Sequence, residues 1–294
     1  MAEQKFKGVI VSALTPFTEE GKVDELGLES LLEFFISKGV NGILALATAG
    51  QGPLMSIEER KLVAQVILNK CHNRIPVMVH VGALTTRETV ILAEHACSMG
   101  ADAVASLPPL YMRLDMASYE QHYRAISSAV SPIPVFVYNN PWAQGRALTP
   151  EELLSLNEKK IINGVIDSSR DLGSIYKLIG HEDQLTVIIA DTKLSMPGVL
   201  YGCPALATAI GNVIPELFVE MFNAVQEKNI EKAVELHLKI FKISEHLRTP
   251  ENGALYEGLA ARGVPCGVPR LPVRRPSEKE KEIIHSVVKD YKLE

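Results

Sequence analysis

The sequence predicts an α/β protein built as a parallel (β/α)8 barrel with additional helices after it. Eight short runs rich in Val, Ile, Leu and Ala alternate with segments of helical periodicity. The runs are continuously apolar, as expected for strands that helices cover on both faces. The length of 294 residues suits one barrel. A doubly wound open sheet is the alternative that the same alternation permits.

The eight predicted strands share β-branched or small apolar residues and are bounded by turn residues. In chain order they cover residues 8–17, 41–48, 75–81, 101–109, 133–141, 161–167, 185–191 and 205–212. Because the run at 161–167 ends in a charge and two serines follow it, we expect a strand that leads into a loop.

The helices follow the strands and show the 3.6-residue period. The first helical segment, residues 24–40, carries one apolar stripe, formed by Leu28, Leu31, Leu32, Phe35 and Ile36. Gly39 is a candidate C′ residue that ends it. Ser56 and Glu59 have the spacing of a capping box at the start of the second helix. The other predicted helices cover residues 85–100, 115–130, 149–158, 171–180, 215–229, 230–248, 252–263 and 277–291.

The last helices exceed what a minimal barrel needs. We therefore expect residues 1–225 to form the barrel and residues 226–294 to form a helical extension packed on it, as one structural unit. The Pro-rich segment 263–276 joins two helices and is expected to be a rigid turn, not a linker.

Composition excludes several classes of protein. The net charge is −5 and no basic patch is visible, so we expect no nucleic-acid partner. No apolar run of about 18 residues is present, so we expect no membrane span. The four cysteines form no CxxC pair, and no N-terminal signal pattern is seen, which favours a cytoplasmic protein. His, Cys and carboxylate residues show no ligand-like clustering, so neither a metal nor another cofactor is expected.

In such a barrel, functional side chains lie at the carboxyl ends of the strands and in the loops that follow. Four stretches at these positions carry a family resemblance: ATAGQGPLMSIEER, VYNNP, GVIDSSRD and IADTKLSMPGVLYG. In order, they resemble the strand-2 loop, the strand-5 Tyr-Asn-x-Pro, the strand-6 Gly-Ile/Val-Lys-x-Ser/Thr-Ser/Ala-Gly-Asp and the strand-7 Gly-x-Asp segment of the dihydrodipicolinate synthase and N-acetylneuraminate lyase family. The resemblance spans nearly the whole chain. The stretches VHVGALTTRET and ADAVASLPPLY look closer to the lyase branch.

The resemblance implies class I aldolase chemistry on pyruvate or a related 2-oxo acid. In that family a strand-6 lysine forms a Schiff base with the ketone, and the protonated imine acts as an electron sink. A strand-5 tyrosine relays protons, with a second tyrosine lent by a neighbouring subunit. Amides and hydroxyls of the strand-2 loop hold the carboxylate.

Several residues match these roles. Tyr138 fits the strand-5 tyrosine, and Tyr111 fits the tyrosine lent across the subunit interface. The substrate-binding positions that the resemblance implies are Thr48, Ala49, Gly50, Ser168 and Asp191.

The departures from the pattern are equally specific. Ile166 stands at the lysine position, and isoleucine has no lone pair with which to form an imine. Ala49 replaces a hydroxyl residue, Gln51 a glutamate, and Ala143 the arginine of the synthase branch. Thr192 stands where the lyase branch has a glutamate. Because several polar groups differ together, we favour natural divergence over an introduced substitution at position 166.

Three residues near the strand ends permit a second interpretation. Asp167, with the serines after it, could cap the next helix. His80 could face the cavity as a base or simply be packed in the core. Lys193 could be a relocated Schiff-base lysine, although long lysines usually direct their heads to water.

Three functions stay open at this level. The first is a lyase of this family that acts on a 2-oxo acid or sugar acid without the usual imine. The second is a non-catalytic relative that binds a small carboxylate or serves in assembly. The third is unrelated barrel chemistry with His80 and Asp191 as an acid/base pair. The resemblance also implies a homotetramer built as a dimer of dimers.

Overall fold

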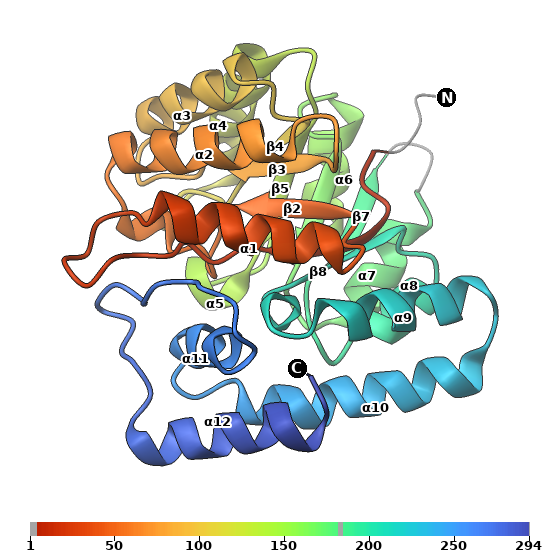
Figure 1. The fold of residues 1–294 in the computed structure, drawn as a ribbon. Coiled ribbons are helices and arrows are strands. Elements are labelled where there is room, and N and C mark those ends of the chain that lie inside the picture. Colours follow the sequence, from red (N-terminus) through yellow and green to blue (C-terminus); the bar gives the residue numbers. More distant parts are fainter. Residues whose placement is uncertain (1–4, 182–184, 294) are drawn as a thin grey trace.

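The computed structural model describes residues 5–181 and 185–293, and these form a closed barrel of eight parallel strands, the TIM barrel (Figure 1). The strands pair in sequence order, and β8 closes on β1. Their bounds are β1 Gly8–Ser12, β2 Gly42–Ala45, β3 Val77–His80, β4 Ala103–Ser106, β5 Val135–Asn139, β6 Gly164–Asp167, β7 Thr186–Ile189 and β8 Ala205–Thr208. The barrel prediction is therefore confirmed, and the open-sheet alternative is wrong.

Helices surround the barrel and connect successive strands. Their bounds are α1 Glu25–Ser37, α2 Ile57–Cys71, α3 Thr86–Ser98, α4 Met116–Val130, α5 Pro141–Gln144, α6 Pro150–Glu158, α7 Leu172–Ile179, α8 Ser195–Leu200, α9 Pro215–Gln226, α10 Ile230–His246, α11 Gly253–Ala261 and α12 Glu278–Asp290. Two short 3₁₀ helices, η1 Gly52–Leu54 and η2 Ile210–Asn212, follow β2 and β8.

The sequence-based bounds need three kinds of correction. Every predicted strand is longer than the observed one, because apolar residues continue into the loops beyond the hydrogen-bonded ladder. The short helices α5 and α8 were not predicted, since four and six residues are too few to show a helical period. Ile36 is only half-buried, whereas Leu28 and Phe35 of the same predicted stripe are fully buried.

The local start and stop signals of the first two helices are confirmed. The Ser56 hydroxyl accepts a hydrogen bond from the Glu59 N–H, and the Glu59 carboxylate accepts one from the Ser56 N–H. Gly39 has a φ of +77° directly after the C-cap of α1, a conformation that glycine adopts without steric cost.

The apolar core has two parts. The larger part lies between the strands and the surrounding helices. The smaller part fills the inside of the barrel, and its members include Ile10, Leu44, Phe136, Tyr138, Ile166 and Ile188. Gly164 makes room for this filling, because a Cβ there would lie 2.1 Å from Cε1 of Phe136. In the part of the chain that the structure describes, side chains thus fill the barrel interior at this level.

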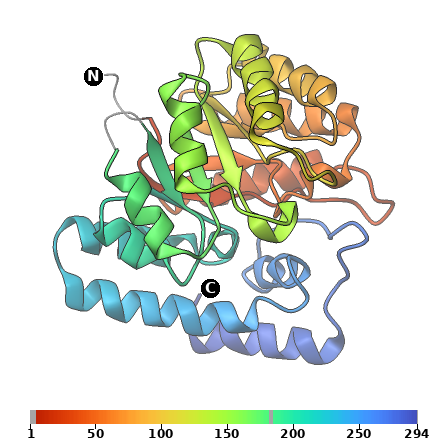
Figure 2. The same cartoon turned by 180° about the vertical axis from the view of Figure 1, so that it is seen from behind.

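The C-terminal helices lie across one end of the barrel. Figure 1 shows α10 and α12 (blue) below the strands, with α11 between them and the barrel, and Figure 2 shows the same layer from behind. Helix α9 contacts β1, whereas α10 packs on α8, α9 and α12. Because α10 packs on other helices whereas α9 contacts the barrel strand β1, residues 226–294 remain the proposed C-terminal extension.

Candidate active site

One cavity of about 400 Å³ opens at the carboxyl end of the barrel. Its walls come from the ends of the strands, from the loops after them, and from the segment between α10 and α11 that covers this face. The residues that line it are Ser12, Leu44, Thr48, Ala49, Tyr138, Asn140, Trp142, Ser168, Arg170, Ala190, Asp191, Thr192, Ala207, Thr208, Ala209, Ile210, Leu247, Arg248, Glu251, Asn252 and Leu255. All the substrate-binding positions predicted from sequence line it except Gly50, which is buried next to Ala49.

Tyr138 and Ile166 lie side by side inside the barrel. They are register partners on β5 and β6, and Ile166 also pairs with Ile188 on β7. Tyr138 lines the cavity, and its hydroxyl oxygen accepts a hydrogen bond of 3.4 Å from Nδ2 of Asn140. Ile166 is 1% exposed and packs in the inner cluster without lining the cavity. Position 166, where the resemblance predicts the family lysine, is therefore a piece of apolar packing beside Tyr138.

The loop after β2 offers backbone donors to the cavity. Within the part of the chain that the structure describes, no backbone hydrogen bond occupies the N–H groups of Thr48, Ala49 and Gly50. Leu46 and Gln51, at either end of this stretch, both have left-handed φ values, of 61° and 55°. Successive amides in such a turn can form a nest for an anion regardless of the side chains.

Gln51 holds this loop in place. Its Nε2 donates to the Arg270 carbonyl at 2.8 Å, and its Oε1 accepts from the Arg270 N–H at 3.3 Å and lies 3.3 Å from the Tyr256 hydroxyl oxygen. The Tyr256 hydroxyl also lies 2.8 Å from the carbonyl oxygen of Thr15, to which it donates. The Gln51 amide thus connects the β2 loop to α11 and to the segment before α12, and Gln51 does not line the cavity.

The Asp167 carboxylate forms hydrogen bonds with neighbouring residues of the protein. Its carboxylate accepts hydrogen bonds from Nδ2 of Asn139 at 2.9 Å and from the Ser169 hydroxyl and N–H at 2.6 and 2.9 Å. Burial raises its pKa, and the Ser169 and Asn139 hydrogen bonds oppose that rise. The helix-cap interpretation is wrong for this residue, because Asp171 is the N-cap of α7. Ser168 lines the cavity while its hydroxyl donates to the Ala190 carbonyl at 3.0 Å.

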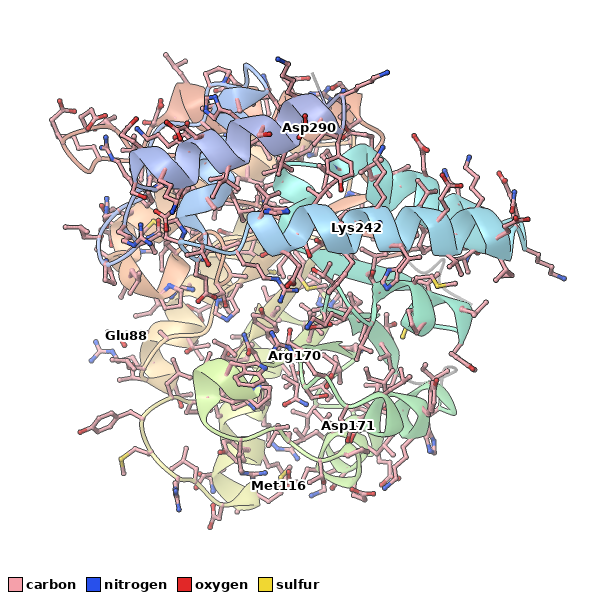
Figure 3. All side chains as sticks on the ribbon, turned by 90° about the horizontal axis from the view of Figure 1, so that it is seen from below. Glu88, Met116, Arg170, Asp171, Lys242 and Asp290 are labelled. Atoms are coloured by element: carbon pink, nitrogen blue, oxygen red, sulfur yellow. The ribbon has the colours of Figure 1, made fainter. Side chains whose placement is uncertain are left out.

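The mouth of the cavity contains a group that sequence reasoning missed. Arg170 donates from Nε to Oδ2 of Asp191 at 2.9 Å, and its guanidinium carbon lies 4.6 Å from the centroid of the Trp142 ring. Figure 3 looks onto this face and labels Arg170 near its centre. The available signal was Arg170 itself, which stands at the glycine of the strand-6 motif.

Asp191 belongs to this group as well as to the predicted site. Its Oδ1 accepts from the N–H groups of Lys193 and Leu194 at 2.8 and 3.2 Å. These contacts fix the carboxylate that faces Arg170. Asp191 therefore serves as an anchor for a cation at the cavity mouth.

Neither alternative base lies at the cavity. The Lys193 ammonium lies 5.5 Å from the centroid of the Phe241 ring on α10, and Lys193 does not line the cavity. His80 is 1% exposed, and its Nε2 accepts from the Leu107 N–H at 3.2 Å. Burial, together with the nearby Arg60 charge, lowers the pKa of His80 to about 3. The interpretation of His80 and Asp191 as an acid/base pair is not supported, because the imidazole lies outside the cavity.

Tyr111 projects away from its own chain. It is 97% exposed, in the loop between β4 and α4, and has a φ of 77°. It does not line the cavity of this chain. A large aromatic side chain held outward in this way suits the predicted role across a subunit interface, which stays a prediction.

We expect the protein to become less stable in mild acid, because two of its histidines, His80 and His122, are buried. Burial lowers the pKa of His122 to about 4, and that of His80 is about 3. In the unfolded chain both imidazoles bind a proton near pH 6.5, so the unfolded state binds more protons below that pH. The free energy of unfolding is expected to fall by about 2 kcal/mol per histidine between pH 7 and pH 5.

Urea unfolding at the two pH values checks this expectation. His122→Asn keeps a polar group near Oγ1 of Thr86, which lies 2.9 Å from the His122 Nδ1. This variant should lose about 2 kcal/mol less than the parent between pH 7 and pH 5. An equal loss in both proteins would show that His122 is protonated in the folded state.

The structure indicates neither a metal site nor a membrane helix in the residues it describes. Among residues 5–181 and 185–293, no cluster of three His, Cys, Asp or Glu side chains could hold a metal ion. Over the same residues, the helices are too short or too polar to cross a bilayer.

Comparison with known proteins gives a consistent result. The model of the dihydrodipicolinate synthetase family matches residues 5–291. A 4-hydroxy-tetrahydrodipicolinate synthase of Methanocaldococcus jannaschii is 32% identical over 290 residues, which cover 98% of this chain and 99% of the relative.

Solved structures agree with the fold. YagE, a prophage protein of the dihydrodipicolinic acid synthase family from E. coli K12, solved in complex with pyruvate, superposes with a TM-score of 0.92 at 27% identity, over 98% of this chain and 99% of YagE. A sialic acid aldolase of Ruminococcus gnavus has a TM-score of 0.93 at 24% identity, over 98% of this chain and 99% of that protein. At that identity the aldolase supports the fold alone.

Proposed function

Because the chain belongs to the dihydrodipicolinate synthetase family, we propose that its cavity binds the carboxylate of a small 2-oxo acid or sugar acid without forming an imine. One observation carries the proposal. The described residues that line the cavity include no lysine, and an apolar side chain fills the position of the family nucleophile. Isoleucine cannot attack a ketone, so covalent catalysis has no starting point at this site.

The β2 loop and Tyr138 supply the groups that we propose to bind the carboxylate. Thr48 and Ala49 line the cavity, and the amides from Thr48 to Gly50 are available as donors. The hydroxyl of Tyr138 faces the same space and is supported by Asn140. These groups can hold a carboxylate and a neighbouring carbonyl oxygen through hydrogen bonds.

A lyase that works without an imine is the second candidate. It is favoured by Tyr138, whose hydroxyl could move a proton at the bound acid. The two candidates differ in turnover, so a panel of 2-oxo acids and sugar acids assayed for cleavage or addition products separates them. Product formation that Tyr138→Phe abolishes would support the lyase.

The central experiment combines trapping with calorimetry. The protein is incubated with pyruvate and sodium borohydride and then weighed intact by mass spectrometry. We expect no pyruvate adduct on the protein, whereas calorimetry detects pyruvate binding. A reduced adduct on any lysine would contradict the proposal, as would a lack of binding across the acid panel.

A pair of charge variants locates the binding site. Thr48→Asp places a carboxylate at the cavity wall, and Leu54→Asp places one on η1 of the same loop, outside the cavity. Both parent residues are exposed, so both variants should fold. We expect about tenfold weaker pyruvate binding for Thr48→Asp alone, because like charges repel at short range.

We also propose that the chain assembles as a cytoplasmic homotetramer. The exposed Tyr111 and neighbouring Met112, which is 62% exposed, supply apolar surface suited to a contact between copies. The four cysteines are free thiols, which agrees with a reducing compartment. Sedimentation velocity of Tyr111→Ala tests the assembly.

A further inference from the structure

Arg170 has a backbone conformation that is unfavourable for a residue with a side chain. Its φ is +64°, in the left-handed region where a Cβ is crowded by the backbone. The strand-6 motif of the family has glycine at this position, which would meet the same turn without strain. A strained residue at the mouth of a cavity suggests that its side chain has a function there.

Contacts from two other loops hold the guanidinium. Asp191, after β7, accepts from Nε at 2.9 Å, and the ring of Trp142, on α5 after β5, lies 4.6 Å from the guanidinium carbon. Asp191 is only 10% exposed and is itself held by the Lys193 and Leu194 amides. The Arg170 side chain is therefore oriented before any ligand arrives.

The terminal nitrogens of Arg170 are free to bind a ligand. The ion pair with Asp191 uses Nε, and among the residues that the structure describes Nη1 and Nη2 have no hydrogen-bond partner. Arg170 lines the cavity, so these donors are accessible from it. A guanidinium with two parallel N–H groups available matches the two oxygens of a carboxylate.

Other charges at the cavity do not replace this donor. Arg248 and Glu251 also line it, from the segment between α10 and α11, and they contribute one charge of each sign. Arg248 already uses a terminal nitrogen, Nη1, in its ion pair with Glu245 at 3.2 Å, whereas Arg170 pairs through Nε and keeps both terminal nitrogens. Ala143, at the position of the arginine in the synthase branch, carries no charge.

We propose that Arg170 selects substrates with a second carboxylate, remote from the one held by the β2 loop. This inference rests on the proposed function, because it places the first carboxylate at Thr48 to Gly50. The cavity volume of about 400 Å³ suits a small dicarboxylic 2-oxo acid. The Trp142 ring, whose centroid lies 4.6 Å from the guanidinium carbon, adds a cation–π contact, and the terminal nitrogens stay available to the ligand.

The test compares two acids that differ in one group. 2-Oxoglutarate and 2-oxopentanoate have the same carbon number, and only the former has a second carboxylate. Calorimetry should give about tenfold tighter binding of 2-oxoglutarate, the size expected for one charge-assisted bidentate contact. In Arg170→Gly the ratio of the two Kd values should fall to about one.

Two further variants make the result specific. Lys228→Gly also replaces a cation at a left-handed position, with a φ of 59°, in the turn between α9 and α10, and it should keep the ratio of the parent. Arg170→Lys keeps the positive charge but replaces the planar guanidinium with a compact ammonium. This variant should keep only part of the preference for 2-oxoglutarate over 2-oxopentanoate. Circular dichroism confirms that each variant is folded.

The possible results of these binding experiments distinguish failure of the Arg170 inference from failure of the proposed function. Equal affinities for the two acids in the parent protein, or an unchanged ratio in Arg170→Gly, would overturn the role of Arg170 and leave the proposed function standing if pyruvate binds. Absence of binding for pyruvate and both acids would overturn the proposed function together with this inference.

Discussion

Replacing Ile166 with lysine is expected to make the protein trap pyruvate as a reduced adduct without producing an efficient aldolase. The new stem would lie between Tyr138 and Ile188, its register partners on β5 and β7. Burial disfavours the charged ammonium and lowers the pKa of such a lysine, so more of it is present as the nucleophilic amine. Borohydride trapping followed by peptide mass spectrometry should place the adduct at position 166.

Turnover is expected to stay near background in this variant. Ala49 and Ala143 lack the hydroxyl and guanidinium that accompany the lysine in the family pattern, and Gln51 is committed to Arg270 and Tyr256. Imine formation alone does not supply the proton transfers that follow it. Restoration of aldolase activity by this one change would show that the rest of the site is complete and that only the lysine has been lost.

The same variant should be less stable. Ile166 is 1% exposed in the inner core, and a polar amine there loses hydration. We expect the free energy of unfolding to fall by about 3 kcal/mol, as for other buried polar substitutions. Ile166→Met is the matched control, since it keeps an apolar side chain of similar volume, should cost less than about 1.5 kcal/mol and should give no adduct.

Arg60→Met is expected to destabilise the protein strongly, although Arg60 does not line the cavity. Arg60 is 3% exposed, and its two terminal nitrogens donate to the carbonyls of His80 and Gly82 at 2.8 and 2.9 Å. Removal of the guanidinium leaves both buried carbonyl oxygens without these donors, which costs about 3 kcal/mol in total. Chemical denaturation monitored by fluorescence or circular dichroism measures the change.

Arg74→Met provides the comparison for Arg60. The Arg74 guanidinium also has two close acceptors, the carboxylate oxygens of Glu33 at 2.6 and 2.9 Å, but this pair lies at the surface. Water and salt screen exposed ion pairs, so its loss should change stability far less. Equal effects in the two variants would contradict the view that burial makes Arg60 important.

Much of the fold could be predicted because its signals are local. The apolar run at Val135–Asn139, the helical stripe with Leu28 and Phe35, and the Ser56 capping box all depend on residues within a few positions of one another. Strand ends were predicted less well, since apolar loop residues such as Leu14 and Ala47 look like strand residues until the ladder is known.

The candidate site likewise has one part that the sequence predicted and another part that it did not. Sequence motifs placed Tyr138, Thr48 and Asp191 near one another, because the ends of parallel strands meet at one face of a barrel. They did not reveal that Asp167 binds Asn139 and Ser169. Side-chain direction and partner choice depend on neighbours that are distant in the chain.

The sequence by itself determined the alternation of strands and helices and the family to which the chain belongs. It also motivated the proposal that Ile166 stands in place of the family nucleophile. Only the tertiary structure decided that His80 and Lys193 do not line the cavity and that Arg170 does. Arg170 meets Trp142 and Asp191, which lie 28 and 21 positions from it on the loops after β5 and β7. Closure of the barrel brings these loops together, and no local pattern of residues encodes that contact.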